Sequence, residues 1–252
     1  MRQNARFEAI VRRLSEEGNV GVSELAAELA VSSATIRRDL QTLEEQRLLA
    51  RTHGGAMTLN VLYELPLRYK AGHLKDEKRR IAEAAASRVE EGMAIGLTGG
   101  TTTMEVARAV SELDHLTVVT NSLSIGSELA VRPNLRLVVT GGVARSASYE
   151  LVGPLADATL ASLNLDIAFV GVDGIDVDAG LTTYHEAEAH TNRAMIARAR
   201  SVVVVTDHSK LGKVAFAQIC ELPAVHEVVC DAAAEPVAVT ALRNAGMKVT
   251  LV

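Results

Sequence analysis

Apolar side chains recur at helical spacing in three short stretches of the first 58 residues. They are Phe7, Ile10, Val11 and Leu14 in the first stretch, Leu25, Ala26 and Leu29 in the second, and Ile36, Leu40 and Leu43 in the third. Each stretch predicts a helix that buries one face. Two strand-like segments, 48–52 and 56–59, then flank the turn sequence His53-Gly54-Gly55. Three helices followed by a β-hairpin predict a winged helix-turn-helix over residues 1–58.

The pattern changes at Asp76, where short apolar segments begin to alternate with amphipathic ones. The expected strands are 93–97, 116–120, 135–140, 167–171, 201–206, 227–230 and 248–252, and the expected helices are 76–91, 102–111, 124–131, 187–199 and 237–245. This alternation predicts a Rossmann-like α/β domain over residues 76–252, with a mostly parallel sheet flanked by helices. Residues 59–75 lack a clear period and contain Pro66, so we expect a linker there.

Composition narrows the class of protein. The 252 residues are 48% hydrophobic and 23% charged, which is ordinary for a globular chain. No apolar run reaches the roughly 18–20 residues that cross a bilayer, and the arginine-rich start lacks the apolar segment of a secretion signal. Cys220 and Cys230 do not form a CxxC pair. We therefore expect buried, reduced thiols and a cytoplasmic protein that needs no metal, cofactor or membrane.

The net charge of −5 argues against a nucleic-acid partner until its distribution is considered. Residues 1–58 carry eight Arg and eight Asp or Glu, whereas the remainder carries 18 basic and 23 acidic residues. The first domain is therefore neutral. A neutral domain still presents a basic face to DNA when its charges are segregated.

The third predicted helix holds the candidate DNA contacts. Its outer face presents Arg37 and Arg38, and arginine binds a guanine edge or a phosphate through two parallel hydrogen bonds. An Arg pair on a helix is more often a solvated surface, but here the preceding helix, the turn and the wing favour DNA. We predict DNA contacts from Ser32, Ser33, Ala34, Thr35, Arg37, Arg38 and Gln41 on this helix, and from Arg51 and His53 on the wing.

Other polar residues of this segment have structural interpretations. Ser23 is expected to cap the second helix, and Ser32 or Ser33 the third, because serine satisfies free N–H groups at a helix start. Asp39 is expected to orient a nearby arginine rather than to contact a base.

Polar clusters follow five predicted strands of the second domain, at 96–103, 120–122, 140–142, 171–176 and 207–210. Each alone is compatible with a plain loop, but the ends of parallel strands gather at one edge, where ligands bind. The Gly/Thr run 96–103 opens a helix and suits a phosphate, although it lacks the lysine of a P-loop and the GxGxxG spacing. The predicted effector contacts are Thr98, Gly99, Gly100, Thr101, Thr102, Asn121, Ser122, Gly141, Gly142, Asp173, Gly174, Glu188, Asp207 and Lys210.

Four of these residues have expected roles. Lys210 neutralises a phosphate, and Asp173 and Asn121 bind sugar hydroxyls. Glu188 either binds a hydroxyl or caps its helix.

Two motifs resemble the DeoR family of bacterial regulators. The run Ser32-x-x-Thr35-Ile36-Arg37-Arg38-Asp39-Leu40 is similar to that family's recognition helix, and Arg51-x-His53-Gly54-Gly55-Ala56 to its wing. The resemblance extends over nearly the whole chain. It implies a regulator of sugar metabolism, usually a repressor released from its operator by a phosphorylated sugar.

The second domain also resembles ribose-5-phosphate isomerase in the phosphate loop, in segment 165–176 and in Asp207-x-Ser209-Lys210. Asp173 persists, but Gly174 stands where the isomerase has a glutamate. Because proton transfer between sugar carbons needs a positioned carboxylate, the resemblance implies binding without turnover. The family's regulators also often have Asp where this chain has Thr98, which weakens assignment of the sugar by analogy.

These features predict a DNA-binding repressor that senses a phosphorylated sugar and is not an enzyme. An active sugar-phosphate isomerase with a DNA-binding arm is the alternative. A third possibility is a regulator whose second domain serves only oligomerisation. Assembly as a dimer or tetramer is expected, because one recognition helix covers only a half-site of operator DNA.

Overall fold

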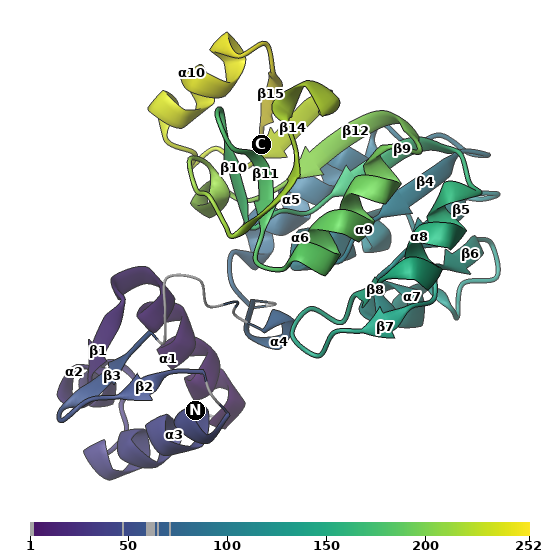
Figure 1. Ribbon diagram of the computed structural model, residues 1–252. Coiled ribbons are helices and arrows are strands. Elements are labelled where there is room, and N and C mark those ends of the chain that lie inside the picture. The colour runs from purple at the N-terminus through teal and green to yellow at the C-terminus, as the bar shows by residue number, and fades with distance from the viewer. Residues whose placement is uncertain (1–2, 47, 59–63, 65, 71) are drawn as a thin grey trace. The chain divides into compact units, whose positions relative to one another are not determined.

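The computed structural model describes the chain except for residues 1–2, 47, 59–63, 65 and 71 (Figure 1). It divides into two compact units, Met1–His73 and Leu74–Val252. Each unit has its own hydrophobic core. The two units are therefore described separately.

The N-terminal unit contains the predicted helices and hairpin. Its elements are α1 Gln3–Glu17, β1 Asn19–Gly21, α2 Val22–Glu28, α3 Ser33–Glu45, β2 Ala50–Arg51, β3 Gly55–Met57 and α4 Leu67–Lys70. The sheet has the order β1-β3-β2 and is antiparallel. Strand β1 was not predicted. It explains Gly55, because a Cβ at this position would lie 1.8 Å from the carbonyl oxygen of Val20.

The core of this unit uses the predicted apolar positions. Ile10, Leu14, Leu25, Ile36 and Leu40 are each at most 2% exposed. The prediction for Ser23 was wrong, since α2 begins at Val22 and Gly21 is its N-cap without a side-chain bond. Capping by Ser23 would start the helix at Glu24, but α2 starts two residues earlier, directly after the last residue of β1.

Part of the expected linker segment is helical. Helix α4 packs against α1 within the N-terminal unit. The ring of Tyr69 lies against its core, and the Tyr69 hydroxyl donates to Gln46 Oε1 at 2.9 Å. Much of the remaining expected linker lies outside the described residues.

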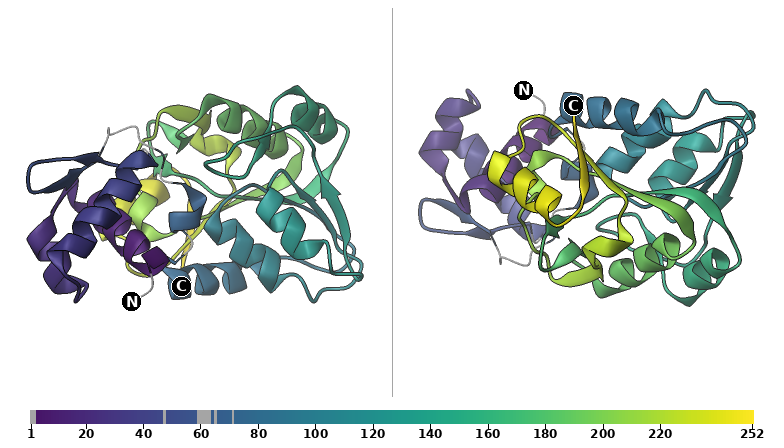
Figure 2. Two further views of the ribbon diagram at one scale, coloured as in Figure 1. Left: turned by 90° about the horizontal axis from the view of Figure 1, so that it is seen from below. Right: turned by 90° about the horizontal axis from the view of Figure 1, so that it is seen from above.

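The C-terminal unit is built on a parallel sheet of seven strands with helices on both faces (Figure 2). In sheet order the strands are β15 Lys248–Leu251, β14 Glu227–Cys230, β12 Ala199–Val205, β9 Leu165–Val170, β4 Ala94–Leu97, β5 Thr117–Thr120 and β6 Arg136–Val139. One core holds α5 Lys75–Ala86, α6 Thr101–Ala109 and α7 Leu123–Leu129 against one face. The other holds α8 Pro154–Ala161, α9 Glu186–Ile196 and α10 Pro236–Asn244 against the opposite face. The predicted fold class is confirmed.

Several short elements of this unit were not predicted. A small antiparallel sheet has the order β10-β11-β13, formed by Gly174–Asp176, Gly180–Thr183 and Ala217–Cys220. A hairpin pairs β7 Val143–Ala144 with β8 Leu151–Val152, and two 3₁₀ turns, His208–Lys210 and Leu222–Ala224, complete the unit. These strands have two to four residues, too few for alternation to emerge. Over the described residues, no helix is long and apolar enough to cross a membrane.

Candidate functional site

Helix α3 displays the predicted DNA-contacting residues. Ser32 is its N-cap, and the Ser32 Oγ accepts a hydrogen bond from the Thr35 backbone N–H at 3.2 Å. Ile36, Leu40 and Leu43 face the core, which leaves the side chains of Arg37 and Arg38 exposed. Ala34 and Gln41 are exposed as well, whereas Ser33 and Thr35 are half-buried. The helix therefore offers two arginines near a capped N-terminus, the end that carries partial positive charge.

Asp39 ties α3 to α1. The carboxylate is 2% exposed, and it accepts from Arg6 Nε at 2.6 Å and from Arg6 Nη2 at 3.0 Å. The hydrogen bond to this carboxylate raises the pKa of Arg6. Orientation of an arginine by Asp39 is confirmed, and Asp39 faces the interior rather than the outer surface of the helix.

The wing residues lie on and beside the β2–β3 hairpin. Arg51 is exposed on β2, and its backbone N–H donates to Glu44 Oε1 at 3.1 Å. His53 is exposed in the turn between the strands. The hairpin is thus anchored to the end of α3, and its polar side chains remain available to solvent.

In the C-terminal unit, the five polar clusters all follow strands of the large sheet. They come after β4, β5, β6, β9 and β12, and these strands are parallel, so the clusters share one edge. Thr98 links two of them, because its Oγ1 accepts from the Gly171 N–H at 3.0 Å. Thr98 itself is fully buried, and within the site it makes a structural contact.

The loop after β4 leads directly into α6. Gly100 is the N-cap of this helix with φ 143°, a conformation that favours glycine. Thr101 and Thr102 form the first turn, and the Thr103 Oγ1 donates to the Gly100 carbonyl at 3.1 Å. The first N–H groups of a helix lack partners within it, so this turn is suited to an anion.

Two lysines gather around Asp207, which is 4% exposed. Its Oδ1 accepts from the backbone N–H of Ser209 at 3.1 Å and from the Ser209 hydroxyl at 2.5 Å. Burial opposes ionisation of Asp207, but the Ser209 hydrogen bonds and the charges of Lys210 and Lys78 outweigh it and lower its pKa. Lys78 is only 3% exposed and was not predicted. The sequence pattern could have identified Lys78, because it lies on the buried face of α5 together with Ile81 and Ala82.

A second group of charges joins α9 to the loop before β8. Thr183 Oγ1 lies 3.1 Å from Asp173 Oδ2 and 3.2 Å from Glu188 Oε2. Arg145 forms an ion pair with Glu188, which is 2% exposed. His185 rather than Glu188 caps α9, so the capping interpretation of Glu188 was wrong. Arg145 was missed, because it follows no predicted strand.

Asn121 lies at the centre of a third, buried group. Its Nδ2 donates to Glu150 Oε2 at 2.9 Å and to Asn192 Oδ1 at 3.3 Å. Ser122 caps α7 through its hydroxyl. Neither Glu150 nor Asn192 was predicted, since both lie outside the five clusters.

The remaining glycines have backbone roles. Gly141 and Gly142 have φ values of 74° and 123°, and a Cβ on Gly142 would lie 2.8 Å from the Val152 carbonyl oxygen. A Cβ on Gly174 would lie 2.3 Å from the carbonyl oxygen of Lys213 and 2.7 Å from Thr182 Oγ1. The present backbone therefore has no room for a glutamate at position 174.

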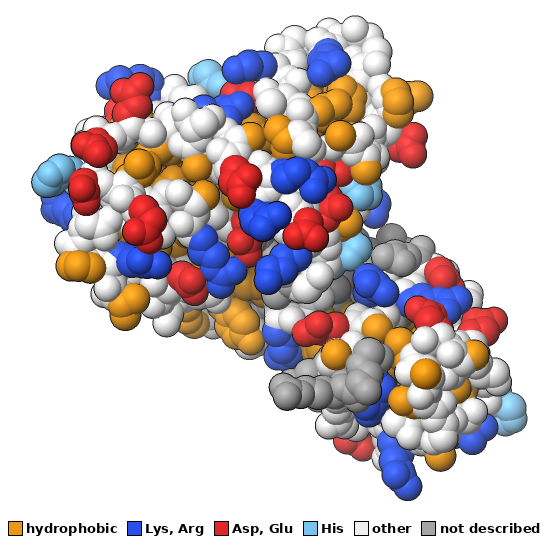
Figure 3. Space-filling view, turned by 180° about the vertical axis from the view of Figure 1, so that it is seen from behind, with side chains coloured by type: hydrophobic (Ala, Val, Ile, Leu, Met, Phe, Trp, Pro, Cys, Tyr) orange, Lys and Arg blue, Asp and Glu red, His pale blue; other side chains and the backbone are white. Residues whose placement is uncertain are grey.

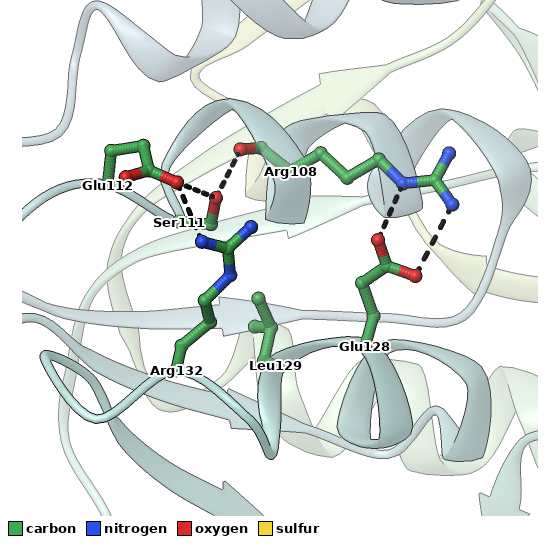
Figure 4. Close-up of a pocket in the computed structure, with 6 residues that line it drawn as sticks. All are labelled: Arg108, Ser111, Glu112, Glu128, Leu129 and Arg132. Atoms are coloured by element: carbon green, nitrogen blue, oxygen red, sulfur yellow. Dashed lines mark hydrogen bonds and ion pairs between the residues drawn. The ribbon is translucent and has the colours of Figure 1, made fainter.

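A groove between α6 and α7 is lined by charged residues away from this edge (Figure 4). Arg108 Nε pairs with Glu128 Oε1 at 3.0 Å, and Arg132 Nη1 with Glu112 Oε1 at 2.8 Å. Arg108 stands at the C-terminal end of α6, opposite the Gly99–Thr102 loop. Because both arginines of the groove are already paired with glutamates, the groove is a poor site for an anion. The exposed face in Figure 3 likewise mixes both signs of charge over the C-terminal unit.

Comparison with known proteins gives matches over both units. Residues 6–60 match the family model described as a DeoR-like helix-turn-helix domain, and residues 74–232 match the DeoR C-terminal sensor domain. The chain is 34% identical to the glycerol-3-phosphate regulon repressor of Escherichia coli strain K12 over 232 residues, 92% of each chain. It is 36% identical to the HTH-type transcriptional regulator GlpR of Haloferax volcanii over 241 residues, 95% of this chain and 94% of that one.

Solved structures are more distantly similar. A ribose 5-phosphate isomerase A from Methanocaldococcus jannaschii shares 24% identity over 54% of each chain, with a TM-score of 0.40. A similarity of this size carries no argument about activity or ligand. The family matches and the two regulators carry the assignment, and they show that this chain belongs to the DeoR family.

Proposed function

We propose that the protein represses a sugar-metabolism operon and that a phosphorylated sugar, bound to the C-terminal unit, relieves repression. The observation that carries the DNA-binding part is the geometry of α3. One face is buried, the N-terminus is capped, and Arg37 and Arg38 are exposed on a helix that Asp39 fixes to α1. A recognition helix in the major groove needs this combination of rigid support and free donors. The names of the relatives support repression.

The effector part of the proposal rests on the chemistry gathered at the sheet edge. The α6 turn offers N–H groups, and Lys78 and Lys210 contribute positive charge near Asp207. Asp173 and Glu188 supply acceptors for hydroxyl groups. A ligand that carries both an anionic group and several hydroxyls matches these donors and acceptors. A phosphorylated sugar has this chemistry.

Repression and relief are connected by linkage. If the effector binds more tightly to the arrangement with low DNA affinity, it weakens DNA binding by the same coupling free energy. The DNA partner is expected to be a two-fold operator, with the protein assembled as a dimer or tetramer in the cytoplasm.

The crowded surroundings of Gly174 disfavour the isomerase alternative. Residue 174 is glycine and supplies no carboxylate as a proton-transfer base, and the backbone of Lys213 and the side chain of Thr182 leave no room for a side chain there. We infer a sensor without turnover. Incubation of the purified protein with ribose 5-phosphate tests this directly, and formation of the ketose would contradict it.

The test of the proposed function combines DNA and effector. An operator is first selected from random duplexes, and its affinity is measured by fluorescence anisotropy with and without a panel of sugar phosphates. One of them is expected to weaken operator binding and to raise the melting temperature of the protein, because it binds only the folded state. If no sugar phosphate changes operator affinity, the effector part of the proposal is wrong. If the protein selects no DNA sequence, both the DNA-binding part and the effector part are refuted.

A further inference from the structure

The anion-binding loop at the start of α6 already has a carboxylate beside it. Glu150 is 5% exposed, and its side chain covers the α-carbon of Gly99. A Cβ added at Gly99 would lie 2.3 Å from Glu150 Cγ, 2.4 Å from Oε1 and 2.6 Å from Cδ. In this structure, therefore, the space that glycine leaves open at residue 99 is filled by the protein's own Glu150.

Backbone pairing places Glu150 against this loop. Ser122 and Glu150 form an isolated antiparallel bridge, and the Leu151 N–H donates to the Asn121 carbonyl at 2.7 Å. This pairing joins the segment before β8 to the end of β5, next to β4 in the sheet. Glu150 consequently approaches Gly99 from the neighbouring strand end.

The buried partner of Glu150 is incompletely satisfied. Asn121 is fully buried, and its side-chain hydrogen bonds to Glu150 and Asn192 both use Nδ2 as the donor. Within the part of the chain that the structure describes, Asn121 Oδ1 is a buried oxygen without a hydrogen-bond partner. An unsatisfied buried acceptor is costly, and a ligand hydroxyl arriving at this position would satisfy it.

Backbone strain lies next to the same residue. Tyr149 has φ 58°, in the left-handed region that bulky side chains rarely adopt. Its N–H donates to the Arg145 carbonyl at 2.8 Å, and the Arg145 N–H donates to the Glu150 carbonyl at 2.9 Å. The tight turn 145–150 thus holds Glu150 over the loop in a conformation with two unfavourable features, the strained Tyr149 and the unsatisfied Asn121.

We propose that the Glu150 carboxylate is a built-in competitor for the anionic group of the effector, which binds at the Gly99–Thr102 loop by displacing it. This inference rests on the proposed function, because it assigns the anion to that loop. Two like charges at the α6 N-terminus repel each other, so a ligand that displaces Glu150 binds more weakly unless additional contacts offset the displacement. Glu150 therefore selects against simple anions and in favour of ligands whose hydroxyl groups also reach Asn121.

Calorimetric titration of the full chain with inorganic phosphate tests this proposal. Glu150→Gln keeps the shape and an oxygen for Asn121 Nδ2 but removes the charge, and it is expected to bind phosphate at least tenfold more tightly than the wild type. Glu150→Asp keeps the charge but withdraws it by one methylene, and it is expected to bind more tightly as well. Glu112→Gln is the control: it removes the same charge from an exposed residue beyond the far end of α6, and it is expected to leave phosphate affinity unchanged.

The outcomes separate this inference from the proposed function. Equal phosphate affinity in the wild type and both Glu150 variants leaves the anion loop intact and overturns the role of Glu150. If phosphate binds none of the four proteins, the assignment of the anion to the loop is itself overturned. If the variants do not fold, the carboxyl carbon resonance of Glu150 in ¹³C-labelled wild type provides the test. It is expected to shift on saturation with phosphate, and an unchanged resonance overturns the proposal.

Discussion

The Arg6–Asp39 ion pair is expected to determine whether α3 is held in place. Arg6→Ala leaves the Asp39 carboxylate, 2% exposed, without its two hydrogen bonds at 2.6 and 3.0 Å. Removing one partner of a buried pair costs about 3–5 kcal/mol. Because the Arg6 side chain is 12% exposed and water can partly replace it, we expect about 3 kcal/mol. A unit of this size has a stability of roughly 4–11 kcal/mol, so it stays folded but opens far more often.

Hydrogen exchange of the full chain measures this loss within the N-terminal unit alone. Amides of α3 that exchange only when the unit unfolds are expected to exchange about a hundredfold faster in Arg6→Ala, since each 1.4 kcal/mol is about a tenfold change. Amides in the strands of the C-terminal unit provide the internal reference. Operator affinity is expected to fall as well, because α3 loses its fixed position.

Two control variants make this prediction specific. Arg13→Ala removes an arginine from the same helix, but its partners Glu17 and Glu28 are exposed, so α3 exchange is expected to remain close to wild type. Arg6→Ala combined with Asp39→Ala removes both charges and is expected to be less destabilised than Arg6→Ala alone. If Arg6→Ala and Arg13→Ala had the same small effect, the ion pair would not be what holds α3.

Two further predictions concern the C-terminal unit. Lys210→Ala is expected to keep wild-type operator affinity but to weaken the response to the sugar phosphate at least tenfold, measured by anisotropy; an unaltered response would remove Lys210 from the site. Hydrogen bonds from Arg88, Thr250 and Lys248 outweigh burial and lower the pKa of Glu227 to about 2. Its folded pKa lies below the unfolded value, so this stabilisation is present above pH ~4.5 and is lost as the pH falls toward 2. Glu227→Gln is therefore expected to cost about 2 kcal/mol in urea unfolding at pH 7, and a gap to wild type that failed to narrow in acid would contradict the assignment.

The sequence predicted the helices and strands that are long enough for a pattern of apolar residues to emerge. Each expected strand of the large sheet is present to within about two residues, and the buried positions of α3 were identified individually. Elements of two to four residues, such as β1 and the small sheet β10-β11-β13, were missed, because their strands depend on partners distant in sequence. Helix α8 was also missed, because it begins at Pro154 and has apolar residues around most of its surface.

The candidate site was predictable in part for a similar reason. Residues that follow strands were found, because the fold class alone places strand ends together. The same edge also receives side chains from a loop and a helix, namely Arg145, Glu150 and Asn192. Their presence there becomes evident only from the packing of these elements. Lys78 is an intermediate case, since a lysine on the apolar face of α5 could have been identified from the pattern.

The central claim is that α3 reads DNA, and Arg37→Ala tests it most directly. The affinities of wild type and variant are compared on the selected operator and on a scrambled duplex, with the melting temperature of both proteins as the control for folding. Arg37 is exposed and makes no contribution to the core, so the variant is expected to fold normally. We expect operator affinity to fall at least tenfold, while binding to the scrambled duplex changes much less. Unchanged operator affinity in a folded Arg37→Ala protein would contradict the assignment of α3 as the recognition helix.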